Sequence, residues 1–298
     1  MSTPAVAALV VAALILVPLI VIGAFVGSIA FPNPMFRFWR RHKPARWGLV
    51  ARSAHLPNGA PLWYFAAPGP ADPQRLTVAV FHGRSRHRGW MLPLIARLAR
   101  RWDVIAIDFP SHGDGRFGPT TIGAREADSV DQTLTWARAA GATRLAVYGV
   151  SMGGAASIIA LGRSDANADV EALVTDGAFD TFWSVVEHMK RWFPGFPRPL
   201  LELTASLVAR ITGVDPRTVR PVDVASALPG RVVFLHGDRD WLVPRAAATR
   251  LAEASRGRGV ARYYHGRHDQ PANPAMQDAV EAVFAEVEAD PERAASRR

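Results

Sequence analysis

A serine between glycines, at the junction of an apolar run and a run of small residues, constrains this fold more than any other feature. The serine is Ser151, in the pentapeptide Gly149-Val-Ser-Met-Gly153. Residues 144–148 before it, which are apolar after Arg144, have the length of a buried strand, and the small residues 154–161 after it favour a helix. A strand that turns directly into a helix leaves almost no room for side chains beside the turn, which suits glycine. The pattern predicts a tight strand–turn–helix that lifts the Ser151 hydroxyl over the edge of a sheet.

Strand-like and helix-like segments alternate along the rest of the chain. Eight apolar runs have the length and composition of strands: Trp47–Arg52, Leu62–Ala67, Leu76–Phe81, Asp103–Ile107, Arg144–Tyr148, Glu171–Thr175, Arg231–Leu235 and Val260–Tyr264. From the third run onward, helical segments follow the strands: Met91–Arg101, Thr121–Ala140, Met152–Arg163, the region Thr181–Gly213, Arg245–Ser255 and Ala275–Glu288. This alternation predicts an α/β fold with an eight-stranded, mostly parallel sheet and helices on both faces. The first two runs should form an antiparallel edge hairpin through residues 57–60.

The amino-terminal segment has the composition of a membrane-spanning helix. No charged residue occurs from Pro4 to Phe31. A helix of this length would reach roughly 40 Å, which exceeds the ~30 Å hydrocarbon core of a bilayer. A cleavable signal peptide ending near Ser28-Ile-Ala30 is the alternative, but the apolar run is too long and nothing basic precedes it. We therefore expect one N-terminal transmembrane helix, an uncleaved anchor over residues 1–35.

Charge beside this segment predicts its orientation. Residues 36–46 form a basic juxtamembrane linker in which aromatic side chains alternate with arginine and lysine. Such residues face the cytoplasm, so we expect a single-pass membrane protein with a cytoplasmic domain. The linker contributes to a net charge of 35 − 26 = +9. Because no nucleic-acid-binding motif accompanies this charge, we expect no nucleic-acid partner. The chain has no cysteine, which excludes disulfides and thiolate chemistry.

The remaining boundaries follow from the pattern of predicted elements. The globular domain should span residues 47–288 and include a small helical, lid-like region at 180–228. Residues 289–298 form a short charged tail that we expect to be disordered.

Polar residues gather where the predicted strands end, and sites in doubly wound sheets form at those carboxyl ends. Five exits carry serine, histidine or aspartate, at residues 82–85, 108–115, 151, 236–244 and 265–270. Together they resemble the α/β-hydrolase fold family, over about residues 47–288. The chain is most similar to membrane-anchored serine hydrolases of that family that lack a large inserted cap. The resemblance implies an esterase- or lipase-like enzyme.

Within this resemblance, Ser151 is the expected nucleophile. A serine hydroxyl is a poor nucleophile until a base takes its proton. His268 and His265 compete for the role of base. We favour His268 because Gly266-Arg-His268 looks like the family's Gly-x-His loop after the last strand, whereas His265 sits at the strand end.

An acid must hold the base in its productive tautomer, and Asp238 and Asp240 compete for this role. We favour Asp240, because His236-Gly-x-x-Asp240 resembles the family's pattern. Asp238 is then interpreted as a turn-stabilising side chain. The chain order serine, aspartate, histidine agrees with that of this fold.

The negative oxygen of a tetrahedral intermediate needs hydrogen-bond donors already in place. The backbone N–H of Met152, at the start of the helix after the turn, is one expected donor, and the N–H of Arg84 is the other. His82 and His112 are interpreted as structural loop residues. Asp176, after the sixth predicted strand, is interpreted as a helix cap.

Six of the nine histidines fall at strand exits, so a metal site has to be considered. No pair of them has the i,i+4 spacing of helical zinc ligands, and the nearby carboxylates have other roles. The sequence also has no G-x-x-x-x-G-K-[ST] motif, and no G-x-G-x-x-G motif follows the first predicted strand, so a nucleotide cofactor is not expected. We expect neither a metal nor a cofactor.

Two apolar helical stripes lie between the sixth and seventh predicted strands, at 182–193 and 200–211. They either cover the sheet or form a small lid that lines an acyl pocket and touches the bilayer. The basic cluster Arg84, Arg86, His87 and Arg88 either favours an anionic head group or belongs to a solvated loop.

The sequence thus predicts a membrane-anchored serine hydrolase that cleaves carboxylic esters or thioesters through an acyl-enzyme, with lipid-like esters as one candidate substrate class. The same triad would serve a peptidase, an amidase or an acyltransferase. The non-enzymatic alternative is an inactive hydrolase fold that acts as a membrane-tethered interaction module.

Overall fold

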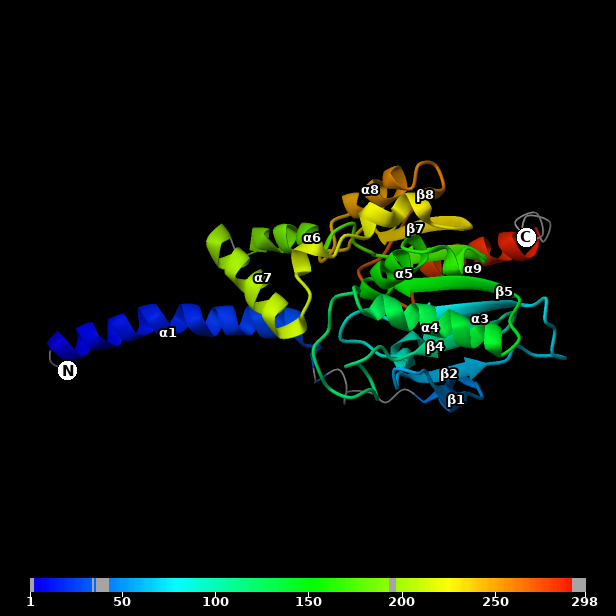
Figure 1. The fold of residues 1–298 in the computed structure, drawn as a ribbon, viewed down its shortest axis with the longest axis horizontal. Coiled ribbons are helices and arrows are strands. Elements are labelled where there is room, and N and C mark those ends of the chain that lie inside the picture. Colours follow the sequence, from blue (N-terminus) through cyan, green and yellow to red (C-terminus); the bar gives the residue numbers. More distant parts are fainter. Residues whose placement is uncertain (1–2, 34, 36–42, 193–196, 291–298) are drawn as a thin grey trace.

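One sheet of eight strands organises the chain (Figure 1). The computed structural model describes residues 3–33, 35, 43–192 and 197–290. The strands are β1 (Arg52–His55), β2 (Pro61–Phe65), β3 (Leu76–Phe81), β4 (Asp103–Ile107), β5 (Arg144–Val150), β6 (Val170–Asp176), β7 (Arg231–Gly237) and β8 (Gly259–Tyr264). Their order in the sheet is β1-β2-β4-β3-β5-β6-β7-β8. β2 runs antiparallel to both neighbours, and all other neighbouring pairs are parallel. The predicted α/β class and the mostly parallel sheet are confirmed.

Helices bury an apolar core against each face of the sheet. On one face, α4 (Glu126–Ala139), α5 (Met152–Gly162) and α8 (Ala246–Ala254) contribute to the first core. On the other face, α3 (Leu92–Leu98) and α9 (Pro274–Glu288) build the second. Strand side chains alternate between the two: in β3, Ala79 belongs to the first core, whereas Val78 and Val80 belong to the second. Burial on both faces explains why the central strands read as continuous apolar runs.

The N-terminal helix α1 (Thr3–Ala30) extends away from the sheet (Figure 1). The helix α7 (Arg198–Thr212) crosses α1 near the carboxyl end of α1. Ile22 and Val26 of α1 are buried against Val208 of α7. In the described part of the chain, the structure contains no helix that is both long and apolar enough to cross a membrane. The predicted span is therefore not confirmed: its residues are helical, and one side of the helix is covered by α7.

The two stripes predicted between β6 and β7 are helical but do not cover the sheet. The first is α6 (Phe182–Met189), whose Val185 packs with Phe179, Val219 and Val243 in a small separate core. The second is α7, which packs on α1. Phe193, the last member of the first predicted stripe, lies outside the described residues. Coverage of the sheet was the wrong interpretation, since both helices lie beyond its faces (Figure 1).

The first predicted strand begins too early. Residues Pro44–Trp47 form a short 3-10 helix that ends at Gly48, where φ is 69°, and β1 starts only at Arg52. The predicted hairpin is confirmed, because β1 and β2 pair antiparallel and the Leu56 N–H donates to the Ala60 carbonyl at 2.9 Å.

The helix predicted from Thr121 begins instead at Glu126. Ile122 and Gly123 both have positive φ, 57° and 106°, which no helix continues through. The Glu126 carboxylate accepts the backbone N–H groups of Thr121 at 3.0 Å and Gly123 at 2.8 Å, so it stabilises this turn at the amino end of α4.

Candidate active site

Ser151 occupies a strained turn between β5 and α5. Its φ is 53° and its ψ is −118°, a region that non-glycine residues avoid. The flanking glycines are required by close packing. A Cβ on Gly149 would lie 2.6 Å from the Gly153 carbonyl oxygen, and one on Gly153 would lie 2.5 Å from the Phe81 carbonyl oxygen. The predicted tight strand–turn–helix is thus present, and the strain concentrates at the serine.

The loops after β5, β7 and β8 bring three side chains together. His268 Nε2 lies 2.9 Å from Ser151 Oγ, and His268 Nδ1 lies 2.6 Å from Asp240 Oδ2. The other oxygen of Asp240 accepts the backbone N–H groups of Leu242 at 2.9 Å and Val243 at 3.0 Å. These bonds fix the carboxylate, which in turn orients the ring. With Nδ1 donating to Asp240, Nε2 is the atom left to accept the serine proton.

Asp240 and His268 stabilise each other's charged forms, so Asp240 stays ionised when the His268 ring is protonated. Burial would raise the pKa of Asp240, but the hydrogen bond and positive charge of His268 outweigh it and lower that pKa. Burial would lower the pKa of His268, but the hydrogen bond and charge of Asp240 raise it above its ordinary value. The carboxylates of Asp269 and Asp176 act in the same direction on His268.

The two competing residues, His265 and Asp238, contact each other rather than the site. His265 Nδ1 lies 3.1 Å from Asp238 Oδ2, and the two side chains are 65% and 37% exposed. Asp238 also accepts the backbone N–H of Gly266 at 3.1 Å, which agrees with its interpretation as a turn-stabilising residue. The structure therefore places neither of them beside Ser151.

The loop after β3 lies directly against the serine. A Cβ added to Gly83 would lie 3.4 Å from the Cβ of Ser151. Met152 is the first residue of α5, so its N–H belongs to the unsatisfied amino end of that helix. To the extent of the described residues, the N–H groups of Arg84 and Met152 donate to no other protein group. Both remain available to a ligand at the site.

Asp176 is not a helix cap, because α6 begins at Phe182 and Thr181 caps it. Its carboxylate is buried at the end of β6 and accepts the Tyr264 hydroxyl, with Oδ1 at 2.9 Å and Oδ2 at 3.1 Å. Burial raises the pKa of Asp176 to about 7, against the opposing effects of Tyr264 and His268. The sequence led us to assign this buried acid a different role, because its partner Tyr264 is distant along the chain.

Asp269 is a residue that sequence reasoning missed. It follows His268 with a φ of 55° and is buried. It accepts Arg86 Nε at 2.7 Å and Trp90 Nε1 at 3.1 Å, so it joins the loop after β8 to the loop after β3. Burial raises its pKa, and Arg86 opposes the rise. Its position next to His268 was the only signal available in the sequence.

The arginines of the predicted basic cluster bond to groups within the protein. Arg86 bonds to Asp269, and Arg88 is buried between Asp108 and Asp114. Arg84 bonds to carbonyl groups of the N-terminal segment. Both interpretations of these arginines, as a site for an anionic head group and as part of a solvated loop, are therefore wrong.

His82 and His112 have the structural positions expected of them. His82 is buried and accepts the Phe109 N–H at Nε2, 3.0 Å away, while its Nδ1 lies 2.7 Å from the Gly83 carbonyl oxygen. Burial lowers its pKa well below the ordinary value, and His112 adds to the effect. His82 therefore remains neutral and supports the loop that carries Arg84.

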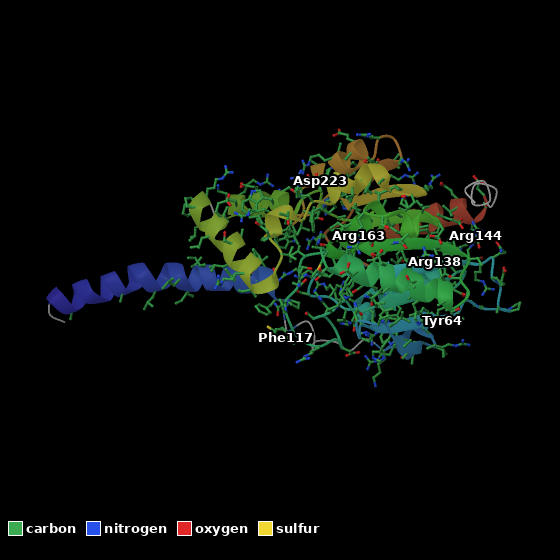
Figure 2. All side chains as sticks on the ribbon, in the orientation of Figure 1. Tyr64, Phe117, Arg138, Arg144, Arg163 and Asp223 are labelled. Atoms are coloured by element: carbon green, nitrogen blue, oxygen red, sulfur yellow. The ribbon has the colours of Figure 1, made fainter. Side chains whose placement is uncertain are left out.

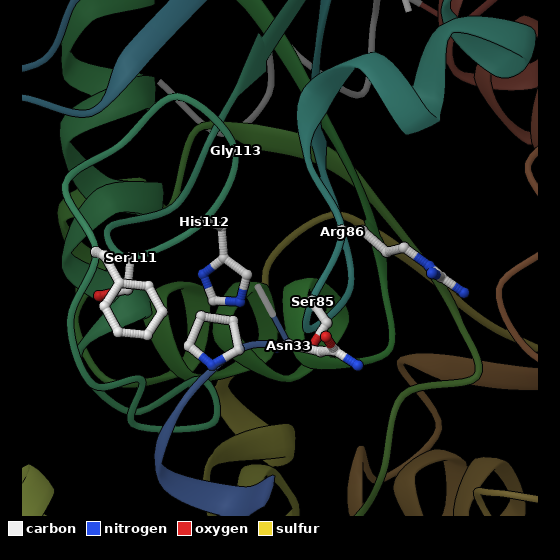
Figure 3. A pocket seen from close by; sticks show the side chains of 8 residues that line it. Asn33, Ser85, Arg86, Ser111, His112 and Gly113 are labelled. Atoms are coloured by element: carbon white, nitrogen blue, oxygen red, sulfur yellow. The ribbon is translucent and has the colours of Figure 1, made fainter. Parts of the chain in front are cut away.

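A small pocket lies beside this loop, between residues 32–33 and the loop after β4 (Figure 3). Ser85 and Asn33 meet at its edge, and the side chain of Arg86 points away from it. Its lining residues are Pro32, Asn33, Ser85, Arg86, Ser111, His112, Gly113 and Phe117. Ser151 is not among them. Nowhere in residues 3–33, 35, 43–192 and 197–290 do three His, Asp or Glu side chains form a group that would hold a metal ion.

Comparison with known proteins concerns the family and the fold of the chain. Residues 78–291 match the family model described as the alpha/beta hydrolase family. The chain is 24% identical to the uncharacterized protein YfhR of Escherichia coli (strain K12) over 185 residues, which are 61% of this chain and 59% of that protein. The match thus spans less than two thirds of this relative.

Solved structures show the same fold. The Pyrococcus furiosus esterase Pf2001 superposes with a TM-score of 0.67 and 18% identity, over 89% of this chain and 98% of the esterase. A membrane phospholipase A, titled a novel bacterial virulence factor, superposes with a TM-score of 0.56 and 16% identity, over 95% of this chain and 96% of its own. At these identities the likeness concerns the fold alone.

Proposed function

The chain belongs to the alpha/beta hydrolase family, and from that premise we propose that it is a serine hydrolase acting on carboxylic esters or thioesters. The observation that carries the proposal is the continuous hydrogen-bonded series from Ser151 through His268 to Asp240. It combines a nucleophile, a base and an orienting acid in one partly buried place. The mechanism also requires hydrogen-bond donors to the oxyanion of the intermediate. The backbone N–H groups of Arg84 and Met152, which donate to no other group among the described residues, meet this requirement.

In the proposed acylation step, Ser151 Oγ attacks the carbonyl carbon while His268 Nε2 takes the hydroxyl proton. The C=O pair moves onto oxygen, and the resulting anion accepts the N–H groups of Arg84 and Met152. When the intermediate collapses, the bond to the alcohol or thiol breaks and His268 returns the proton to that leaving group. Asp240 stays ionised throughout and stabilises the protonated ring.

In the proposed deacylation step, a water molecule replaces the leaving group. His268 takes one water proton as the oxygen attacks the acyl carbon, and the same two N–H groups hold the second anion. Collapse breaks the bond to Ser151 Oγ, which regains the proton from His268. The products are a carboxylic acid and the original enzyme, so the cycle needs no cofactor.

We further propose that the enzyme is attached to a membrane through α1 and acts on lipid-like esters. Support comes from the uncharged sequence 4–31 and from exposed apolar side chains on α1. Among the described side chains these include Val6, Leu16, Val17, Leu19, Ile20 and Val21. Leu203 and Ile211 of the adjoining α7 are also exposed. The fold shared with a membrane phospholipase A is consistent with such a substrate. The basic linker at 36–46 favours a cytoplasmic domain.

Hydrolysis by the purified full-length protein in lipid vesicles tests this function. We expect long-chain esters to be cleaved with a higher kcat/KM than short soluble esters, and Ser151→Ala to abolish both reactions. Much faster turnover of short esters would contradict the proposed preference for lipid-like substrates, while the proposed hydrolase function would stand. Release of the protein from vesicles by alkaline carbonate would contradict the proposal that α1 is an integral membrane anchor.

A further inference from the structure

The carboxyl end of α1 is bound directly to the loop that carries Arg84. The Arg84 guanidinium donates one hydrogen bond to the Ser28 carbonyl and another, 2.6 Å long, to the Phe31 carbonyl. The last carbonyl groups of a helix have no partner within the helix and form the negative end of its dipole. An arginine is well suited to this position, because its planar group donates several bonds at once.

Arg84 makes these bonds from a partly buried position. Burial lowers its pKa to about 10, so the side chain is still protonated at neutral pH. Its Nε is buried and has no partner among the described residues. The contacts of this side chain therefore lie with α1, and no carboxylate bond competes with them in the described chain.

The residues around Arg84 strengthen the same junction. Ser85, with a φ of 60°, accepts the Asn33 N–H at its Oγ, 2.9 Å away (Figure 3). The Thr120 N–H donates to the Ala30 carbonyl at 2.8 Å. Phe31 stacks on Phe117 with ring centroids 5.9 Å apart, and Phe117 lies beside this end of α1 (Figure 2). The end of the helix is thus held by two different loops of the domain.

On its other side, the same loop faces Ser151. Gly83 packs against the serine, and the N–H of Arg84 is one of the two donors in the proposed mechanism. Donors to a developing oxyanion act only when they are already in position, and small displacements reduce the rate strongly. A single residue therefore reaches α1 through its side chain and the site through its backbone.

We propose that Arg84 is a positioning residue through which the end of α1 holds the oxyanion loop in its active geometry. The N-terminal helix is then part of the catalytic unit as well as an attachment to the membrane. This inference rests on the proposed hydrolase function. It predicts that losing the Arg84–α1 bonds lowers transition-state stabilisation while Ser151, His268 and Asp240 remain intact.

The test compares full-length wild type with Arg84→Met, Arg84→Lys and Arg84→Ala. We expect kcat of Arg84→Met to fall about 10- to 100-fold with little change in KM, less than the loss of a whole oxyanion donor. Arg84→Lys, which keeps a charged donor, should recover part of the rate. Millimolar guanidinium should partly rescue Arg84→Ala. The control is Arg258→Met, since Arg258 also donates to a carbonyl, that of Leu228, and should leave kcat unchanged.

A trifluoromethyl ketone separates positioning from general destabilisation. Its serine adduct carries an oxyanion, so its Ki should rise by the same factor by which kcat/KM falls in Arg84→Met. If Arg84→Met does not fold, Ser85→Gly removes the acceptor of the Asn33 N–H and should lower kcat several-fold with the same Ki relation.

The possible results distinguish the two proposals. Unchanged kcat in folded Arg84→Met, or a lowered kcat with unchanged Ki, would overturn the positioning role while the hydrolase stands. An inactive wild type that also fails to bind the ketone would instead remove the proposed function.

Discussion

The Asp240 carboxylate and the His268 ring are joined by a 2.6 Å hydrogen bond in a place almost closed to solvent, with side-chain exposures of 1% and 10%. The same two loops carry a second pair, His265 and Asp238, joined at 3.1 Å on the surface. The chain therefore contains its own matched control, since two aspartate–histidine contacts differ in burial and in distance from Ser151.

Asp240→Asn should lower kcat by roughly 1,000- to 10,000-fold, because an amide cannot hold His268 in the productive tautomer or stabilise its charge. Asp238→Asn should change kcat less than about twofold, as expected for an exposed pair. Steady-state ester hydrolysis measures both. Equal losses in the two variants would contradict the assignment of Asp240.

On the acid side of the pH profile, kcat/KM should fall at a pH above the ordinary pKa of histidine. His268 acts as a base only when neutral, and its pKa is raised, so kcat/KM should fall as the pH drops through that raised value. Because the Asp269 charge raises this pKa, Asp269→Asn should move this fall to lower pH. Measurement of kcat/KM from about pH 5 to about pH 9 tests the direction. A fall that moves to higher pH would contradict this account.

Asp176 should make stability depend on pH. Its folded pKa of about 7 exceeds the ordinary 3.8 because it is buried, so the folded state binds the proton more tightly than the unfolded state. Its contribution is complete below about pH 4 and is lost as the pH rises through about 7. Asp176→Asn should therefore gain stability relative to wild type as the pH rises across this range. Thermal unfolding of both proteins at several pH values measures the difference, and a constant difference would refute it.

Gly153→Ala should destabilise the fold by ~1–3 kcal/mol or more, because the added methyl group would meet the backbone carbonyls of Phe81 and His82 at 2.5 and 2.6 Å. Gly23→Ala is the control, as nothing lies within 4 Å of the added atom there. The melting temperature in detergent reports both. A Gly153→Ala protein as stable as wild type would contradict the close approach of α5 to β3.

The sequence predicts the sheet and the residues that meet at its carboxyl ends because both depend on local patterns. Strand lengths and the glycines at the turn select Ser151, and the resemblance of the motifs after the last two strands to those of the family selects Asp240 and His268. Their roles remain predictions, although the structure places them in hydrogen-bond contact. The helix boundaries could not be predicted as well from the sequence, because the late start of α4 depends on the positive φ of Ile122.

The contacts that link distant segments could not be predicted. Arg84 reaches carbonyl groups more than 50 positions earlier in the chain, and Asp176 bonds to a tyrosine 88 positions later. No periodicity or motif connects such residues, because their proximity follows from packing. The basic cluster illustrates the consequence, since arginines that read as a charged surface are bonded within the protein.

The proposed function requires that Ser151 be an activated nucleophile, and labelling with a fluorophosphonate tests this requirement at the residue itself. Full-length wild type, Ser151→Ala, His268→Ala and His265→Ala would be treated with the probe, and the modified residue located by peptide mass spectrometry. We expect a single adduct on Ser151, no adduct in Ser151→Ala, much slower labelling in His268→Ala and unchanged labelling in His265→Ala. Folded wild-type protein that is not labelled, or that is labelled at another serine, would contradict it.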